Sequence, residues 1–379
     1  VGNKVYLPQD TVHITTREVG EGFALLDVTA QVQSASTVTE RVTLQQTICR
    51  EGTAVLTDRQ NLLLQPGESR TVSFRYCVDS PALWSPESPN LYTSTLQVLE
   101  GEEELDREET SFGIRTLSID AAHGVRINGQ TVKLRGACIH HDNGILGAAT
   151  LPDAGERRIR QLKEAGFNAI RSSHHPAGRA LLDACDRYGV LVMDELSDVW
   201  NVRKNPYDYA LYFEQDWKPT IQKMVAKDYN HPSVILYCVG NEISEAGSES
   251  GAETNRRSDL RDDHGVTFLF ISHDLGVVEH LCDDVAVMYL GQLVETASRD
   301  ALFSSPLHPY TRALLAAVPT LDPDSEPVAA LQGEIPDPSR PPSGCRFSSR
   351  CPQASDRCRR DIPLLREVAD GHLVACHAV

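Results

Sequence analysis

The segment NHPSVILYCVGNE, residues 230–242, ends a run of apolar residues with an amide and an acid, Asn241 and Glu242. An apolar, β-branched run of this length predicts a buried strand, so both polar side chains stand at its carboxyl end. In parallel β/α proteins the carboxyl ends of the strands build the active site. The acid therefore predicts a catalytic or binding edge and raises the question of which group it faces.

A second set of residues that could bind a ligand consists of four cysteines near the end of the chain: Cys345, Cys351, Cys358 and Cys376. The sequence carries no basic-then-apolar leader, so we expect a cytoplasmic, reducing compartment, where clustered thiols bind a metal rather than form disulfides. Soft thiolates suit an iron–sulfur cluster or zinc. Their spacing matches neither paired CxxC zinc ribbons nor the common ferredoxin run, so both metals stay open.

Composition limits the classes of partner. The chain has 379 residues with 41% hydrophobic content and a formal net charge of −17, which predicts several cores and no nucleic-acid partner. No run of about 18 apolar residues is present, so we expect no transmembrane segment. The chain begins at Val1 rather than at methionine, and we therefore expect residues before it.

The spacing of apolar residues changes along the chain, and this change predicts several domains. Residues 11–115 alternate apolar and polar positions between turn signals, as in an all-β, immunoglobulin-like sandwich. From residue 116 to 250, strand-like runs alternate with amphipathic helices, which predicts four β/α units. Such units begin a (β/α)8 barrel, but a whole barrel needs about 250 residues. The sequence therefore predicts only the first half of a TIM barrel, strands 1–4.

The rest of the chain differs in character. We assign residues 251–257 to a junction, 258–318 to an α/β fragment, 319–342 to a proline-rich linker and 343–379 to the four-cysteine tail.

Several motifs in the first 250 residues resemble glycoside hydrolase family 2, the β-galactosidase and β-glucuronidase group. They are LWSPESPNLYT, FGIRT, INGQTVKLRGACIHHD, AGFNAIRSSHHP, YGVLVMDE and NHPSVILYCVGNE, in that order. The resemblance implies that residues 1–10 end a sugar-binding jelly roll and that the sandwich and half-barrel follow. It also implies retaining hydrolysis of β-galactosides or β-glucuronides, so a β-glycoside is the expected substrate.

The same resemblance implies roles for residues at the strand ends. Glu242 corresponds to the general acid/base and Asn241 to the residue that binds the hydroxyl next to the anomeric carbon. Arg171 corresponds to the arginine that holds the nucleophile. The expected lining of the sugar pocket consists of His140, His141, His174, Glu195 and Trp200.

A retaining glycosidase needs two carboxyl groups about 5 to 5.5 Å apart, one of which attacks the anomeric carbon. The family places that nucleophile on the seventh barrel strand. No strand of this kind follows Glu242 in the sequence. We therefore expect an incomplete catalytic pair and no turnover by the chain as encoded.

Residues 258–379 resemble the carboxyl-terminal part of an ATP-binding subunit of an oligopeptide/dipeptide ABC transporter. The motifs are FISHDLGVVEHLCDDVAVMYLGQLVE, SPLHPYTRALLAAVP and GCRFSSRCPQASDRC. The resemblance implies that His273 is a switch-loop histidine that senses the γ-phosphate, that the four cysteines hold a [4Fe-4S] cluster, and that transporter membrane subunits are partners. No GxxxxGK[ST] loop occurs in the sequence, so we expect no complete ATP site.

Three hypotheses follow. The chain is a glycosidase fragment, a transporter ATPase fragment, or a chimeric reading frame without coherent activity. We favour the third for the chain as encoded and the first for its main lineage, because two partial domains joined inside their cores leave sheet edges uncovered.

Overall fold

The computed structural model describes residues 3–120, 123–241, 243, 275, 278–279, 282–317, 333–337 and 340–379. These residues divide into two compact units. The first holds the described residues up to Ile243 and the second those from residue 275 on.

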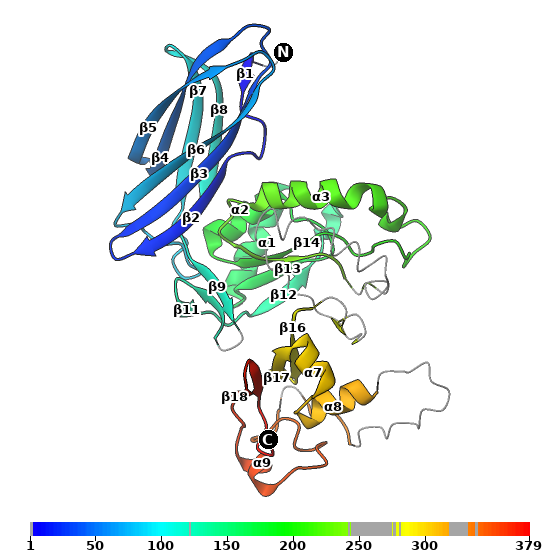
Figure 1. Ribbon diagram of the computed structural model, residues 1–379. Coiled ribbons are helices and arrows are strands. Elements are labelled where there is room, and N and C mark those ends of the chain that lie inside the picture. Colours follow the sequence, from blue (N-terminus) through cyan, green and yellow to red (C-terminus); the bar gives the residue numbers. More distant parts are fainter. Residues whose placement is uncertain are drawn as a thin grey trace. The chain divides into compact units, whose positions relative to one another are not determined.

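The first unit begins with a sandwich of two antiparallel sheets, drawn in blue and cyan in Figure 1. In one sheet β1 and β2 pair with one side of β3 and β6 pairs with the other; the second sheet has the order β5-β4-β7-β8. The strands are β1 (Val5–Tyr6), β2 (His13–Gly20), β3 (Phe23–Ser34), β4 (Glu40–Arg50), β5 (Thr53–Leu64), β6 (Ser69–Asp79), β7 (Tyr92–Glu100) and β8 (Glu103–Phe112).

The alternation in sequence explains the sandwich. In β3 every second side chain from Ala24 to Val32 is buried, and these side chains pack against Leu44, Ile48 and Leu96 of the opposite sheet. The predicted all-β sandwich is confirmed. Its predicted start at residue 11 is too late, because β1 already pairs with β3, so residues 5–6 belong to the sandwich and not to a separate domain.

A short antiparallel sheet follows, in the order β11-β10-β9. It consists of β9 (Leu117–Asp120), β10 (Gly124–Ile127) and β11 (Gln130–Thr131). Ile127 of this sheet and Trp84 of the sandwich pack against Ala169 and Leu191, which begin two strands of the next sheet. The amino ends of those strands are therefore covered, and their carboxyl ends remain for a site.

The parallel sheet has the order β12-β13-β14-β15, with strands Gly136–Ile139, Ala169–Ser172, Leu191–Glu195 and Val234–Cys238. The helices α1 (Pro152–Glu164), α2 (Arg179–Tyr188) and α3 (Phe213–Asp228) connect these strands (Figure 1). Two 3-10 turns, Gly144–Leu146 and Tyr209–Leu211, lie in the loops. Ile159 and Leu182 bury the helices against Ile170 and Val192, so the four predicted β/α strands are confirmed.

The second unit contains an antiparallel sheet of order β16-β17-β19-β18, with strands Asp284–Tyr289, Gln292–Ser298, His372–Val374 and Arg366–Ala369. Its helices are α7 (Arg299–Ser304), α8 (Pro309–Ala316) and α9 (Asp356–Arg360). Phe347 of the cysteine tail packs on Tyr289, with ring centroids 5.2 Å apart. The predicted separate tail is therefore wrong, because its strand β19 pairs with β17 and completes this sheet.

The predicted junction and most of the proline-rich linker lie outside the described residues. Within the part of the chain that the structure describes, no helix is both long and apolar enough to cross a membrane.

Candidate functional site

An ion-pair cluster lies at the carboxyl edge of the parallel sheet. Arg171 comes from β13 and Glu195 from the last position of β14, and His174 lies in the loop after β13. The Arg171 Nε donates to Glu195 Oε2 at 2.5 Å, and His174 Nδ1 lies 2.7 Å from Glu195 Oε1. Both oxygens of this fully buried carboxylate are therefore occupied.

The electrostatics keep this cluster charged. Burial lowers the pKa of Arg171, but the hydrogen bond and the negative charge of Glu195 outweigh burial and leave that pKa above its ordinary value. The arginine is thus a permanent cation at the sheet edge.

Asn241 joins a second polar group to the cluster. Its side-chain oxygen accepts from Arg171 at 3.1 Å, and its Nδ2 donates to Asp198 at 3.0 Å. Lys204 Nζ lies 2.9 Å from Asp198 Oδ1 and 2.6 Å from the Asn241 carbonyl oxygen. Burial raises the pKa of Asp198, but the bonds from Lys204 and Asn241 lower it below its usual range.

The histidines of the first two strand ends lie close together in pairs. The rings of His140 and His174 meet edge to face at 5.3 Å, and His141 Nδ1 lies 3.0 Å from His175 Nδ1. Burial, and then the charge of His175, lower the pKa of His141. Next to them, a 140 Å³ cavity reaches from His140 and His141 to Arg158 of α1 and Arg179 of α2.

The site contains residues that the sequence reasoning missed, namely His175, Asp198 and Lys204. The first directly follows His174 in SSHHP, and Asp198 stands three positions after Glu195, so polar residues just beyond a strand end were the available signal.

Trp200 differs from its prediction as a lining residue. Its side chain is 1% exposed, its indole N–H donates to the Val239 carbonyl at 3.0 Å, and its ring stacks on Phe213 at 5.9 Å. The ring is therefore buried in the domain, and its N–H holds the backbone of Val239, two residues before Asn241. The predicted acid/base Glu242 and the predicted sensor His273 both lie outside the described residues.

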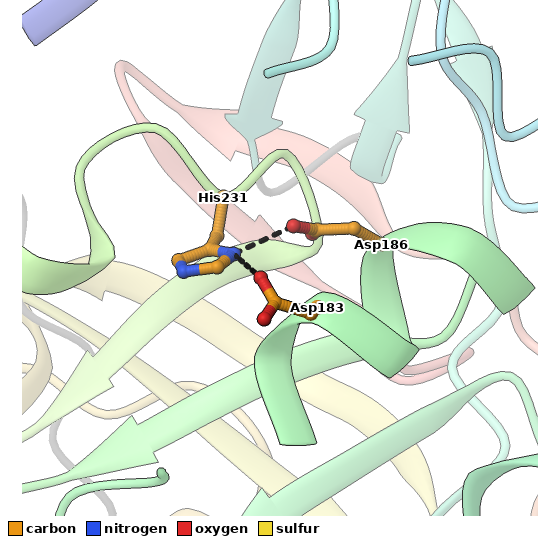
Figure 2. Close-up of side chains that lie close together, drawn as sticks. All are labelled: Asp183, Asp186 and His231. Carbon is orange, nitrogen blue, oxygen red and sulfur yellow. Dashed lines mark hydrogen bonds and ion pairs between the residues drawn. The ribbon is translucent and has the colours of Figure 1, made fainter. Parts of the chain in front are cut away.

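A third cluster lies at the opposite end of the same domain and consists of Asp183, Asp186 and His231 (Figure 2). Its ligand-type atoms lie within 4.8 Å of one another. His231 Nδ1 is 2.6 Å from Asp186 Oδ2 and 4.0 Å from Asp183 Oδ1, so one ring nitrogen faces both acids. A nitrogen that donates a proton to Asp186 does not bind a cation, and we assign the cluster a structural role.

That role is to join α2 to the start of β15 and to the sandwich. Asp186 accepts the Ser233 amide through its side chain at 3.0 Å, and its backbone carbonyl accepts the indole N–H of Trp84 at 2.9 Å.

The four cysteines of the tail share one region of the second unit. Cys358 and Cys376 are buried, and Cys345 and Cys351 are partly buried. Burial raises the pKa of Cys345, a backbone hydrogen bond at Phe347 partly lowers it, and the charges of the three other thiols raise it further. No three of these sulfurs, all within the described residues, lie within 4.8 Å of one another.

The first unit thus consists of a two-sheet sandwich followed by parallel β/α units with a charged cluster at the carboxyl ends of their strands, the arrangement of a sandwich joined to part of a β/α barrel. Two family models, "Glycosyl hydrolases family 2" and "Glycosyl hydrolases family 2, TIM barrel domain", match residues 5–115 and 121–294. A third, "Oligopeptide/dipeptide transporter, C-terminal region", matches residues 294–358. The chain therefore belongs to glycosyl hydrolase family 2 in its first part and carries a transporter-type region at its carboxyl end.

Individual relatives divide in the same way. The β-galactosidase BoGH2A of Bacteroides ovatus is 39% identical over 243 residues, which are 64% of this chain and 29% of that protein. The "Probable peptide ABC transporter ATP-binding protein y4tS" of Sinorhizobium fredii is 54% identical over 124 residues, which are 32% of this chain and 35% of that protein. The chain thus spans about a third of each relative.

Solved structures agree with the first assignment. A glycosyl hydrolase family 2 member from Bacteroides cellulosilyticus matches with a TM-score of 0.69 and 35% identity, over 74% of this chain and 37% of that one. A β-glucuronidase from Bacteroides uniformis matches with a TM-score of 0.60 and 28% identity, over 69% and 34%. The similarity to the Sinorhizobium transporter protein extends over 124 residues, which is more than the chain has after residue 294. The transporter-like part therefore begins before residue 294, inside the range that the barrel model matches.

Proposed function

We propose that the first unit carries the sugar-binding and acid/base half of a retaining β-glycosidase site for β-galactosides or β-glucuronides, and that the chain as encoded does not turn these substrates over. The observation that carries the proposal is the cluster of Arg171, His174, Glu195 and Asn241 at the carboxyl ends of three neighbouring strands. Charged and amide groups of this kind are able to orient sugar hydroxyls by paired hydrogen bonds. Glu242 follows directly and supplies the acid/base.

The lack of turnover follows from the missing nucleophile. Of the two carboxylates that the cluster contains, Glu195 is bonded through both oxygens to Arg171 and His174. Asp198 is bonded to Lys204 and Asn241. Glu195 therefore has no oxygen without a bond, and Asp198 is held by Lys204 and Asn241 in a loop after β14 rather than on a seventh barrel strand, so we assign neither the role of nucleophile.

The test uses activated aryl β-galactosides and β-glucuronides, because a good leaving group removes the need for the acid and leaves the nucleophile as the limiting loss. We expect background turnover and no covalent label from fluorinated mechanism-based glycosides in intact mass spectra. Azide is expected to restore turnover, and Arg171→Ala is expected to abolish that rescue. Arg187→Ala, which removes a cation paired with Glu156 at the carboxyl end of α2, is expected to retain it. Stoichiometric labelling without azide would contradict the proposal.

The cysteine tail supports a second function, the binding of a [4Fe-4S] cluster. The four thiols interact electrostatically with one another, which places them in one region of the second unit. Four soft thiolates suit either an iron–sulfur cluster or zinc, and the resemblance to transporter ATP-binding subunits favours the cluster.

Anaerobic reconstitution of the whole chain with iron and sulfide tests this function, because the tail packs on β17. We expect broad visible absorption that Cys358→Ser removes and Cys282→Ser, outside the tail, retains. Tight stoichiometric binding of zinc and no visible absorption would contradict it.

By the similarity of the second part to transporter ATP-binding subunits, we propose a cytoplasmic location and transporter membrane subunits as partners. Without a phosphate loop, we expect no stoichiometric ATP binding in equilibrium dialysis.

A further inference from the structure

Two buried carboxyl groups lie directly behind the sugar site. Asp194 precedes Glu195 in β14 and is 0% exposed, and Asp228 ends α3 and is 1% exposed. The Oδ2 atom of each has no hydrogen-bond partner when both groups are treated as acceptors. Lys227 Nζ lies 3.9 Å from Asp194 Oδ2, too far for a hydrogen bond, so each carboxyl group keeps one buried oxygen that accepts none. Such an oxygen is costly when it is anionic, and two neighbouring anions add like-charge repulsion.

One proton resolves both costs. The ammonium group of Lys227 pairs with Asp228 Oδ1 and lies 3.9 Å from Asp194 Oδ2, so the two carboxyl groups are neighbours around one lysine. A hydrogen bond between two carboxyl groups requires that one of them is protonated. We propose that Asp194 and Asp228 share one proton at neutral pH. We propose further that this carboxyl pair positions Glu195 and the loop that carries His174. The consequence for sugar binding rests on the proposed function above, whereas the shared proton does not.

The contacts of the pair show how it positions the site. Asp194 Oδ1 accepts the backbone amides of Ala177 at 2.8 Å and of Glu195 at 3.1 Å. Lys227 Nζ donates to the Ala177 carbonyl at 2.8 Å and pairs with Asp228 Oδ1. Ala177 ends the loop that carries His174. The pair and its lysine therefore hold that loop from both sides of one residue.

The charges around the pair favour the shared proton. Burial, and next the charge of Asp194, raise the pKa of Asp228 to about 8, against the opposing effect of Lys227. Among the described groups whose pKa is shifted, His141, Cys185 and Tyr237 also interact electrostatically with these two acids. The pKa of His141 is lowered, and those of Cys185 and Tyr237 are raised well above their ordinary values, so none of the three gains charge near pH 8.

Carboxyl-carbon NMR of the full chain, labelled with ¹³C-aspartate and assigned with Asp228→Asn, tests the proton directly. We expect the pair to release its last proton near pH 8, far above the ordinary aspartate value of about 3.9. Two ionised carboxylates at pH 7 would overturn the proposal.

Stability measurements give a second test of the proton. Between pH 4 and 8 the folded chain retains a proton that the unfolded chain has released, so the folding equilibrium constant falls about tenfold per pH unit from this pair. Asp228→Asn supplies a permanent N–H donor to Asp194, and we expect it to remove that slope. Asp153→Asn, which neutralises an exposed acid at the start of α1, is expected to keep it. Equal slopes in wild type and Asp228→Asn would overturn the proposal.

The positioning role has its own readout, the imidazole resonances of His174. In wild type we expect them to shift with the pair's midpoint near pH 8, in Asp228→Asn to stay in place across that range, and in Asp228→Ala to be shifted at every pH. If wild-type resonances do not move as the pair ionises, the positioning role is wrong, even if the alanine variant does not fold. None of these readouts uses a sugar, so a failure of sugar binding alone would count against the proposed function and not against the pair.

Discussion

Replacing Glu195 with glutamine tests whether the charged cluster is a built site. Loss of one partner from a fully buried ion pair costs about 3–5 kcal/mol, because the other charge is left uncompensated. Glu195 is fully buried, but Arg171 is 28% and His174 21% exposed, so water partly solvates both after the change. Glutamine also keeps one acceptor oxygen. We therefore expect Glu195→Gln to lower the free energy of unfolding by about 2 kcal/mol.

Urea unfolding followed by tryptophan fluorescence is the assay, because all three tryptophans report on this domain. Trp84 packs on the parallel strands, and Trp200 and Trp217 stack on Phe213. Asp198→Asn is the matched control. It also removes one negative charge from the cluster, but its side chain is 43% exposed, so we expect a cost of at most about 1 kcal/mol.

Arg171→Met adds a double-mutant cycle with Glu195→Gln. Because the methionine removes the charge that glutamine would leave uncompensated, we expect the double variant to lose about 1–2 kcal/mol less than the sum of the single changes. If Glu195→Gln costs no more than Asp198→Asn, or if the two changes are additive, the cluster does not act as an ion pair and the reasoning fails.

Two further predictions concern the scaffold. Gly189 has a φ of +64°, and a Cβ added at this position would lie 2.3 Å from the Pro86 carbonyl oxygen. Gly166 has a φ of +88° with no atom near its added Cβ, so Gly189→Ala should lower the free energy of unfolding by about 2 kcal/mol more than Gly166→Ala. Equal costs of the two substitutions would contradict the clash. Burial lowers the pKa of His308 to about 4. The neutral histidine therefore contributes its full stability above about pH 6.5, and about 3 kcal/mol of that stability is lost as the pH falls from 6.5 to 4. His308→Asn keeps the cap on the Tyr310 amide and should remove this acid sensitivity in hydrogen exchange of β16 and β17; unchanged sensitivity would refute it.

Much of the fold could be predicted because the spacing of apolar residues differs between strands and helices and is visible in the sequence of each element. The alternation in 11–115 dictates strands with one buried face, and the units around Ile159 and Leu182 dictate helices that cover a parallel sheet. The resemblance to glycoside hydrolase family 2 named Arg171, His174 and Glu195, and the structure places these three side chains together. Strand ends in parallel sheets meet at one edge, so residues distant in sequence become neighbours by topology alone.

Other features depended on packing between segments that the sequence does not relate. The proline-rich stretch before the tail predicts a separate segment, yet β19 pairs with β17 and Phe347 enters the core of the second unit. Trp200 follows a strand end as a pocket residue would, but its indole N–H and ring found partners inside the domain.

The sequence by itself determined the order of the domains, the four parallel strands and the edge at which the charged residues gather, because these follow from local periodicity and strand direction. Only the tertiary structure decided which acids face one another. Asp194 and Asp228 are 34 positions apart on a strand and a helix, and no spacing rule joins them. Their proximity, and the proton that we propose they share, arise because Lys227 of α3 pairs with Asp228 and reaches Asp194, and because both carboxyl groups are buried.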